Sequence, residues 1–348
     1  MTGDLSITSH HDDHRAGSRR GVLGPPIPRA AALVEQVPTL SATRMTLASD
    51  TAATATRIER LGQYMTEHVL GPSGSCVCRR LGSCRQSVLS VRRGTSPRTA
   101  TFAAGQLSHV GHHYDLMLDG VPMRTLVIAM ETGRAREGVT LKQRHAEVMQ
   151  SASLAFTARN PHMRGVTSAL RLALGQEPGP DRAGELLRLN STRSPVHLFD
   201  AFAMANMRLC SAVVSGTSKS LGNPTMSRNC APHLVATIKI LEPTLCIVQG
   251  VEVYKALTTL MTRRRQVAPS LERARIAGVD TLVAAFTHPS AMRLTDHWGR
   301  LTSAPYLYGT VAPTLRAAHQ LIATPGVQRS KPVGPQRRPR GLNRQPPT

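Results

Sequence analysis

The chain has 348 residues, of which 41% are hydrophobic and only 3% aromatic, so it can build a core mainly of Leu, Val, Ala and Met in one large domain or two. Its 43 Lys and Arg residues against 21 Asp and Glu residues give a formal net charge of +22, which favours a polyanion such as nucleic acid as partner, although an arginine excess can also reflect genomic base composition. No apolar stretch approaches the ~20 residues of a membrane span, and the acidic, histidine-rich start is unlike a signal peptide, so we expect a cytoplasmic protein with no membrane partner.

Three regions are expected along the chain. Residues 1–50 mix His, Arg, Gly, Pro and Ser with little periodicity, which predicts a disordered basic segment. Residues 51–325 carry the periodic apolar patterns and should form the folded domain. Residues 326–348 are rich in Pro and Arg and contain no acidic residue, so this disordered basic tail would add salt-sensitive, non-specific affinity for DNA.

The cysteines are grouped in a way that points to metal binding. A helix is expected over residues 51–70, and Gly71-Pro72 ends it. Three cysteines then fall within nine residues on a glycine-punctuated loop, and two more lie in the middle of the chain. In a reducing compartment such thiols are candidate metal ligands rather than disulfides. The five candidates are Cys76, Cys78, Cys84, Cys210 and Cys230.

Five thiolates exceed the four that such a site needs, and three alternatives stay open: an iron-sulfur cluster, zinc on four cysteines, or free thiols. The sequence does not indicate which two of the three amino-terminal cysteines would bind. Cys246 lies inside an apolar run and is expected to be part of the core.

A second cluster of possible ligands lies near residue 110. His109, His112, His113 and Tyr114 are close together, but apart from Asp115 no carboxylate or second histidine pair completes a ligand set. We therefore expect the edge of a surface hairpin here.

An apolar strand is expected over residues 124–129, followed by Glu131 and a glycine turn. Helices are expected over residues 141–155 and 160–175, and Asn160-Pro161 before the second is typical of a helix cap.

The chain from residue 196 to 250 predicts an α/β unit. An apolar strand begins near Val196 and ends at Asn206, a helical stripe covers residues 231–241, and an apolar run over 244–248 ends in glycine. Open α/β sheets of this kind bind ligands at the carboxyl ends of their strands.

The last part of the domain contains two helices and a strand. A helix over residues 253–260 is expected to end in Arg263-Arg264-Arg265, a run that is usually a solvated helix end and can also contact phosphate. A strand from Thr281 then meets a proline turn, which places His288 and Ser290 at its carboxyl end. A helix over residues 310–323 closes the domain.

Three ordered blocks and one tripeptide resemble the iron-sulfur uracil-DNA glycosylases. The family pattern contains Asn-Val-Val-Lys-Cys, then Cys-x-Pro-x-Leu, then a strand ending in glycine, and later His-Pro-Ser. The similar segments are Asn206-Met-Arg-Leu-Cys210, Cys230-Ala-Pro-His-Leu234, Glu242-Pro-Thr-Leu-Cys-Ile-Val-Gln-Gly250 and His288-Pro-Ser290. The resemblance covers roughly residues 124–293, about half of the chain. It departs from the family in the first motif, where Ala129 replaces the leading glycine and Thr132 the proline.

The resemblance implies an α/β fold, a three-layer α/β/α sandwich around a short, mainly parallel four-stranded sheet. It implies a monomeric DNA repair enzyme that hydrolyses the N-glycosidic bond of uracil, or of a related damaged pyrimidine, in base excision repair. DNA containing uracil would be its partner. A structural 4Fe-4S cluster would be its cofactor, with zinc as the alternative, held by two amino-terminal cysteines together with Cys210 and Cys230.

The resemblance also implies catalytic and base-binding roles. His288 would stabilise the uracil anion as it leaves, and Glu131 would hold or activate the attacking water. Asn206 would read the edge of uracil, and His162 would offer a flat face beneath the flipped base.

Two further residues, Ser290 and Arg293, would bind the phosphates that flank the lesion. The alternative function is a nucleic-acid-binding protein that keeps the fold and the metal cluster with weakened catalysis, which the altered first motif favours. A nucleotide-hydrolysing enzyme would also fit the sheet, but the chain has no Gly-x4-Gly-Lys-Ser/Thr loop.

Overall fold

The structure is a computed structural model that describes residues 46–89, 100–133, 136–214, 220–291, 297–300 and 303–324. The predictions for residues 1–45, for the basic tail and for Arg293 lie outside the described residues. No helix in the described ranges is both long enough and apolar enough to pass through a bilayer.

The central sheet has seven strands in the order β12-β13-β14-β11-β6-β9-β3. Four neighbouring strands run parallel to one another, and they are β14 (Val279–Phe286), β11 (Leu245–Gln249), β6 (Thr125–Ala129) and β9 (Ala203–Asn206). Every residue of β11 and β6 is buried, as expected for parallel strands that are covered on both faces. The predicted α/β class is confirmed.

The sheet has seven strands rather than the expected four, because antiparallel strands extend it on both sides. β12 (Met261–Ala268) and β13 (Leu271–Ile276) form a hairpin beside β14, and β3 (His109–Val110) pairs with β9. The three arginines at 263–265 therefore lie in a strand and not at a helix end. β12 is an edge strand, and exposed charges on an edge oppose pairing with another chain, which is why its sequence lacks an apolar pattern.

The other expected helices lie within two residues of their predicted ends, except that the helix expected over residues 231–241 begins seven residues earlier, at Pro224. They are α1 (Thr51–His68), α3 (Leu141–Ser153), α4 (Pro161–Ala173), α5 (Pro224–Leu241), α6 (Val251–Thr258) and α7 (Ala312–Ala323). Side chains of Asp50, Thr140, Asn160 and Asn223 cap α1, α3, α4 and α5 by accepting a backbone N–H of the first turn. The additional helix α2 (Leu81–Leu89) was not expected, and it removes Cys84 from the predicted loop.

Short elements connect these parts. They are β1 (Leu47–Ser49), β4 (Leu116–Leu118), β5 (Val121–Pro122), β7 (Leu186–Leu187), β8 (Val196–His197), the 3-10 turns η1 (Phe156–Ala158), η2 (Ala183–Glu185) and η3 (Leu198–Asp200), and the π-helical turn η4 (Leu307–Val311).

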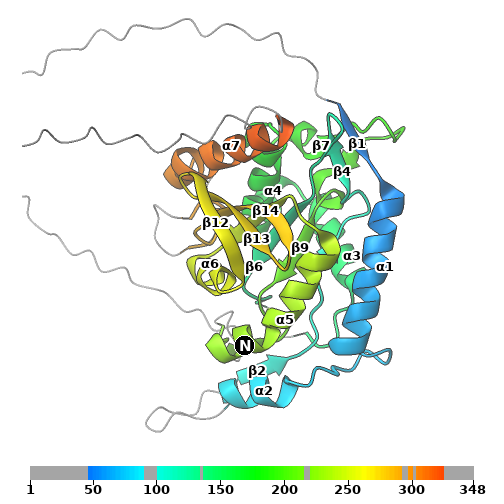
Figure 1. Ribbon diagram of the computed structural model, residues 1–348, viewed down its shortest axis with the longest axis vertical. Helices are drawn as coiled ribbons and strands as arrows, with labels where there is room; N and C mark the ends of the chain where they lie inside the picture. The colour runs from blue at the N-terminus through cyan, green and yellow to red at the C-terminus, as the bar shows by residue number, and fades with distance from the viewer. Residues whose placement is uncertain are drawn as a thin grey trace, which may run out of the picture. The chain divides into compact units, whose positions relative to one another are not determined.

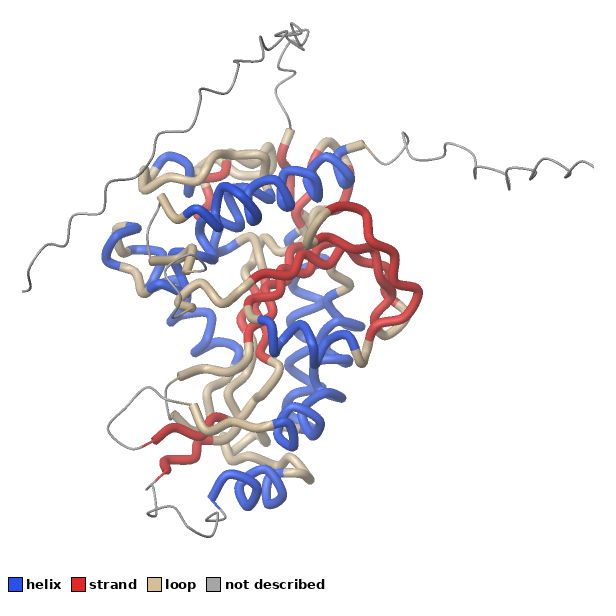
Figure 2. Tube along the Cα trace, turned by 90° about the vertical axis from the view of Figure 1, so that its left-hand side faces the viewer, coloured by secondary structure: helices blue, strands red, loops and turns tan. Residues whose placement is uncertain are grey.

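Each face of the sheet has its own core. On β6, Val127 packs into one apolar cluster, whereas Leu126 and Ile128 pack into the other, because side chains alternate along a strand. The first cluster includes residues of α4 and α7, and the second includes residues of α1, α5 and α6. Figure 2 shows helices on both sides of the strands.

A third, smaller core lies beyond the carboxyl end of β9. There β10 (Ser211–Val214) pairs with β2 (Ala100–Ala103), and α2 packs against both β2 and α5. Figure 1 shows α2, β2 and the first turns of α5 close together. Its buried members are Cys84, Ala104, Cys210 and Met226.

Candidate functional site

The carboxyl ends of the parallel strands bring three of the predicted site residues to one edge of the sheet. Asn206 is the last residue of β9 and pairs with the last residue of β6, and Glu131 follows two positions later. β14 ends in register with β11, two positions before His288. This is the edge at which open α/β sheets bind their ligands.

His288 is held as a neutral hydrogen-bond donor. Its Nδ1 accepts the backbone N–H of Ser290 at 3.2 Å, and the hydroxyl of Ser290 lies 2.9 Å from the same nitrogen. A backbone amide can only donate, so Nδ1 carries no proton and the neutral ring has its proton on Nε2. Burial lowers the pKa of His288, which favours this neutral form. Ser290, expected to bind a phosphate, thus orients the imidazole ring.

His162 lies against His288, as the resemblance requires of two residues in one pocket. Their rings are stacked with centroids 5.7 Å apart and 19° between the planes. Glycines allow this packing, because a Cβ on Gly165 would lie 2.6 Å from Pro289 and one on Gly299 would lie 2.7 Å from the same proline. The rings are too close for a base between them, which would need about 7 Å.

Asn206 is 8% exposed, and no hydrogen bond joins its side-chain amide to another described residue. The main chain beyond it stays fixed to β6, since the N–H groups of Met207 and Arg208 donate to the carbonyls of Ala129 and Met130 at 2.8 and 2.9 Å. An amide without a protein partner remains available to a ligand edge that offers one donor and one acceptor.

Glu131 is engaged by protein groups rather than open to water. One carboxylate oxygen lies 3.2 Å from Nη1 of Arg208, and the Ser220 hydroxyl donates to the other. Ser227 fixes the arginine through a hydrogen bond to Nε at 2.9 Å. Burial raises the pKa of Glu131, and the contacts with Ser220 and Arg208 oppose that rise. The predicted water-positioning carboxylate is therefore one half of a buried ion pair.

Sequence reasoning missed Arg208 as a site residue. The available signal was a charged residue just after a buried strand, within the block from Asn206 to Cys210. Its partner could not be inferred, because Glu131 is 77 residues away in the chain.

The five candidate cysteines come from separate elements and interact pairwise in the structure. Cys76 lies in a bridge beside Leu70, Cys84 lies on α2, Cys210 precedes β10, and Cys230 lies on α5. The thiols interact as two pairs, Cys76 with Cys210 and Cys84 with Cys230.

The fifth thiol, Cys78, stands apart from these pairs. Its sulfur lies 3.5 Å from Nε2 of His233, and it interacts electrostatically with Cys76 and Cys84. Burial raises the pKa of Cys78. The pairing therefore separates Cys78 from the other four candidates.

Each thiol pair contains one sulfur that is readily deprotonated. Hydrogen bonding with Cys210 lowers the pKa of Cys76 to about 7, and hydrogen bonding with Cys230 lowers that of Cys84 to about 6. The pKa values of Cys210 and Cys230 are raised, first by these same hydrogen bonds and then by burial.

The sulfur spacing bears on the kind of metal group. No three of these described sulfurs lie within 4.8 Å of one another. Tetrahedral zinc with Zn–S bonds of ~2.3 Å would hold every pair of sulfurs ~3.8 Å apart. Cys246 belongs to the fully buried part of β11, which confirms it as a core residue.

No protein-family model matches this chain, and no curated protein is similar to it. The interpretation of the site therefore depends on its own geometry.

A separate cavity of about 300 Å³ lies beside this edge. Its walls come from α6, β13 and β14, and include Tyr254, Glu272 and Phe286. Glu272 is 4% exposed and accepts hydrogen bonds from Tyr254 at 2.6 Å and from Arg264 at 2.8 Å. None of the residues predicted from the sequence lines this cavity.

Proposed function

We propose that this protein is a DNA glycosylase that hydrolyses the N-glycosidic bond of uracil, or of a related damaged pyrimidine, and acts as a monomer in base excision repair. The observation that carries the proposal is the common sheet edge at which Asn206 and the His288 turn end parallel strands. The proposed fold is a three-layer α/β/α sandwich of the uracil-DNA glycosylase type, centred on the four parallel strands.

The reaction leaves negative charge on the departing base, so a hydrogen-bond donor is needed to stabilise it. When the C–N bond breaks, its electron pair leaves with uracil, water attacks the sugar carbon, and the proton that the water loses ends on the uracil anion. The Nε2–H of His288 can donate to a pyrimidine oxygen as negative charge develops there. The base must first be flipped out of the duplex, which costs a few kcal/mol and requires a close-fitting pocket.

Asn206 is the proposed specificity residue. Its amide offers one donor and one acceptor, which match the edge of uracil and mismatch that of cytosine. The ring of His162 would supply an aromatic surface for the base, while His288 donates its in-plane Nε2–H.

We propose that Cys76, Cys84, Cys210 and Cys230 hold a 4Fe-4S cluster, with zinc as the alternative. The interaction of Cys76 with Cys210 and of Cys84 with Cys230 supports this ligand set, and four thiolates are the ligands that either group takes. A bound cluster would be structural, since hydrolysis transfers no electron. The four cysteines would link the α2 segment to the end of β9 that carries Asn206.

Incubation with a labelled duplex containing one uracil, followed by alkali, tests this function. We expect strand cleavage with the wild-type protein, and rates about 10²–10³ lower for His288→Ala. Asn206→Ala should also be slow. The matched control is His68→Ala at the exposed end of α1, which should cleave like wild type. An intact strand at excess wild-type protein contradicts the enzymatic function, and full activity in both site variants contradicts the assigned roles.

One observation favours the alternative, a nucleic-acid-binding protein with weakened catalysis. The carboxylate of Glu131 is paired with Arg208 and bound by Ser220, which leaves no described carboxylate of the first motif open to position water. In that case the protein would bind uracil-containing duplex and release no base. Measuring binding and base release on the same duplex separates the two functions.

A further inference from the structure

A second group of metal-binding side chains lies at the amino end of β9, opposite the end that carries Asn206. Asp200 ends η3, just before β9 begins at Ala203. The two ends are separate places, because the chain from Asp200 to Asn206 spans up to about 20 Å. His112 follows β3, and His145 comes from α3.

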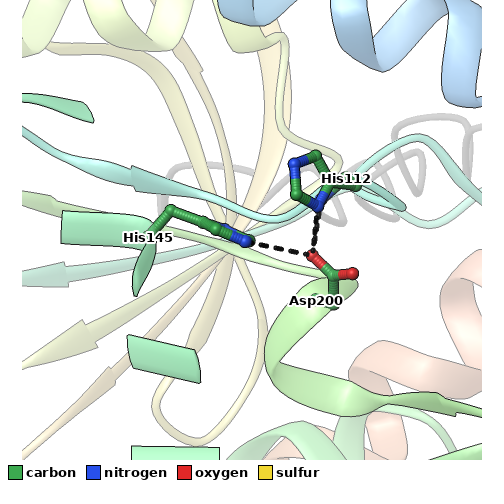
Figure 3. A group of neighbouring side chains, drawn as sticks. All are labelled: His112, His145 and Asp200. Atoms are coloured by element: carbon green, nitrogen blue, oxygen red, sulfur yellow. Dashed lines mark hydrogen bonds and ion pairs between the residues drawn. The ribbon is translucent and has the colours of Figure 1, made fainter. Parts of the chain in front are cut away.

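The three side chains converge on one carboxylate oxygen (Figure 3). Nδ1 of His112 lies 3.2 Å from Oδ1 of Asp200, and Nε2 of His145 lies 3.9 Å from the same oxygen. In the described part of the chain, this is the one set of three such residues whose donor atoms all lie within 4.8 Å of one another. Two imidazole nitrogens and a carboxylate oxygen are donors that zinc, cobalt and iron(II) accept.

The backbone is shaped to bring these groups together. A Cβ on Gly111 would lie 2.4 Å from both the carbonyl carbon and the carbonyl oxygen of Asp200, so only glycine permits the approach. The N–H of His112 donates to Oδ1 of Asp200 at 2.8 Å, and the N–H of His113 donates to its backbone carbonyl at 2.8 Å. The loop after β3 is thereby fixed over the carboxylate before any ion binds.

The ring of His145 is supported from behind by a third imidazole, that of His109. His109 is fully buried and stacks on it with centroids 5.3 Å apart and 15° between the planes. Nε2 of His109 is hydrogen-bonded to the carbonyl of Phe199 at 2.9 Å, so this ring cannot turn toward the ion.

We propose that His112, His145 and Asp200 bind one divalent transition-metal ion of the zinc class. Bonds of ~2.0–2.1 Å to a tetrahedral ion require donors ~3.4 Å apart, so the 3.2 Å and 3.9 Å separations need only small side-chain movements. Three protein ligands leave a fourth position for water or a substrate atom. The ion would join the loop after β3, α3 and η3, and so hold the edge strand of the sheet in place.

Titration of tag-free protein with Co²⁺, followed by absorbance, tests the site. Cobalt bound by imidazole and carboxylate gives weak visible bands without the thiolate-to-cobalt charge-transfer absorption that any binding by the cysteines would add. We expect wild type to bind one equivalent with the weak bands, and His112→Ala and Asp200→Asn to bind it at least ~10-fold more weakly. The His112 side chain is 64% exposed, so its removal should leave folding unchanged.

The matched control is His113→Ala, the next residue in the same loop, whose ring is hydrogen-bonded to Ser49 instead. It should retain the wild-type bands and affinity. Equal Co²⁺ binding by wild type, His112→Ala and Asp200→Asn would overturn the proposal, as would equal loss in the His113→Ala control. The outcome does not depend on whether the protein excises uracil.

Discussion

The two ends of β9 carry two candidate sites that differ in how the chain assembles them. At the carboxyl end, Asn206 and Cys210 belong to one continuous block, and the thiols that meet Cys210 are themselves clustered in nine residues of sequence. At the amino end, Asp200 meets His112 across 88 residues of chain and His145 from a third segment. A site concentrated in short segments is visible as a motif, whereas one built by packing single residues is visible only in the fold.

The largest expected effect is the loss of bound metal when one of the paired cysteines at the carboxyl end is replaced. Cys84→Ser should lower the bound metal at least ~10-fold, because it removes one member of a thiol pair. Cys78→Ser should retain the metal, since Cys78 contacts His233 and belongs to neither pair. Iron and zinc content of the two purified variants is the measurement. Equal metal loss in both would show that the ligand set is misassigned.

The second prediction concerns the ion pair of Glu131 with Arg208, at the carboxyl ends of β6 and β9. Arg208→Ala should lower the free energy of unfolding by about 3–5 kcal/mol, because it leaves the Glu131 carboxylate buried without a cation. Urea unfolding measures this loss. Arg228→Ala, an exposed arginine on α5, is the control and should change stability little. A similar stability for both variants would mean that the Glu131 carboxylate is well solvated.

The third prediction concerns the buried charge network that Glu185 forms with Arg159 and His197. Glu185 is 1% exposed and accepts two hydrogen bonds from Arg159, each at 2.7 Å. Its carboxylate also lies 3.0 Å from Nε2 of His197. Burial would raise the pKa of Glu185, but the bonds to His197 and Arg159 lower it to about 2. Its ordinary value is about 4.3, so the stabilisation is present above that pH and is lost as the pH falls through 2.

A folded pKa of about 2 corresponds to about 3 kcal/mol of acid-sensitive stability. The urea midpoint should therefore fall between pH 5 and pH 2 in wild type, and this fall should be smaller in Glu185→Gln. The exposed Glu177, paired with Arg316, provides the control variant Glu177→Gln, which should follow wild type. Parallel pH profiles for Glu185→Gln and wild type would contradict the network.

The sequence predicted β6, β11 and β14 from their unbroken apolar runs and most helices from the regular spacing of their apolar positions. The single strand expected from Val196 to Asn206 was wrong, because the chain forms β8, the turn η3 and then β9. The prediction failed at β12, whose exposed arginines at 263–265 carry no apolar pattern, since an edge strand has one side without neighbours. It also failed at α2, because Leu81–Leu89 buries little beyond Cys84 and so shows no stripe.

The candidate sites were predictable to different degrees for the same physical reason. The strand ends at Asn206 and His288 could be placed from the residues that terminate strands, and parallel pairing then brings them to one edge. The pairing of Glu131 with Arg208 could not be predicted from the sequence, because it depends on side-chain packing between distant segments. The same holds for the histidines near residue 110, whose missing partners are His145 and Asp200.

The most direct test of the carboxyl-edge site is free uracil released from a uracil-containing duplex in a single turnover, quantified by mass spectrometry with protein in excess over DNA. We predict one uracil released per duplex by wild type, at a rate about 10²–10³ higher than that of His288→Ala. Complete binding of the duplex with no uracil released would contradict the proposed glycosylase.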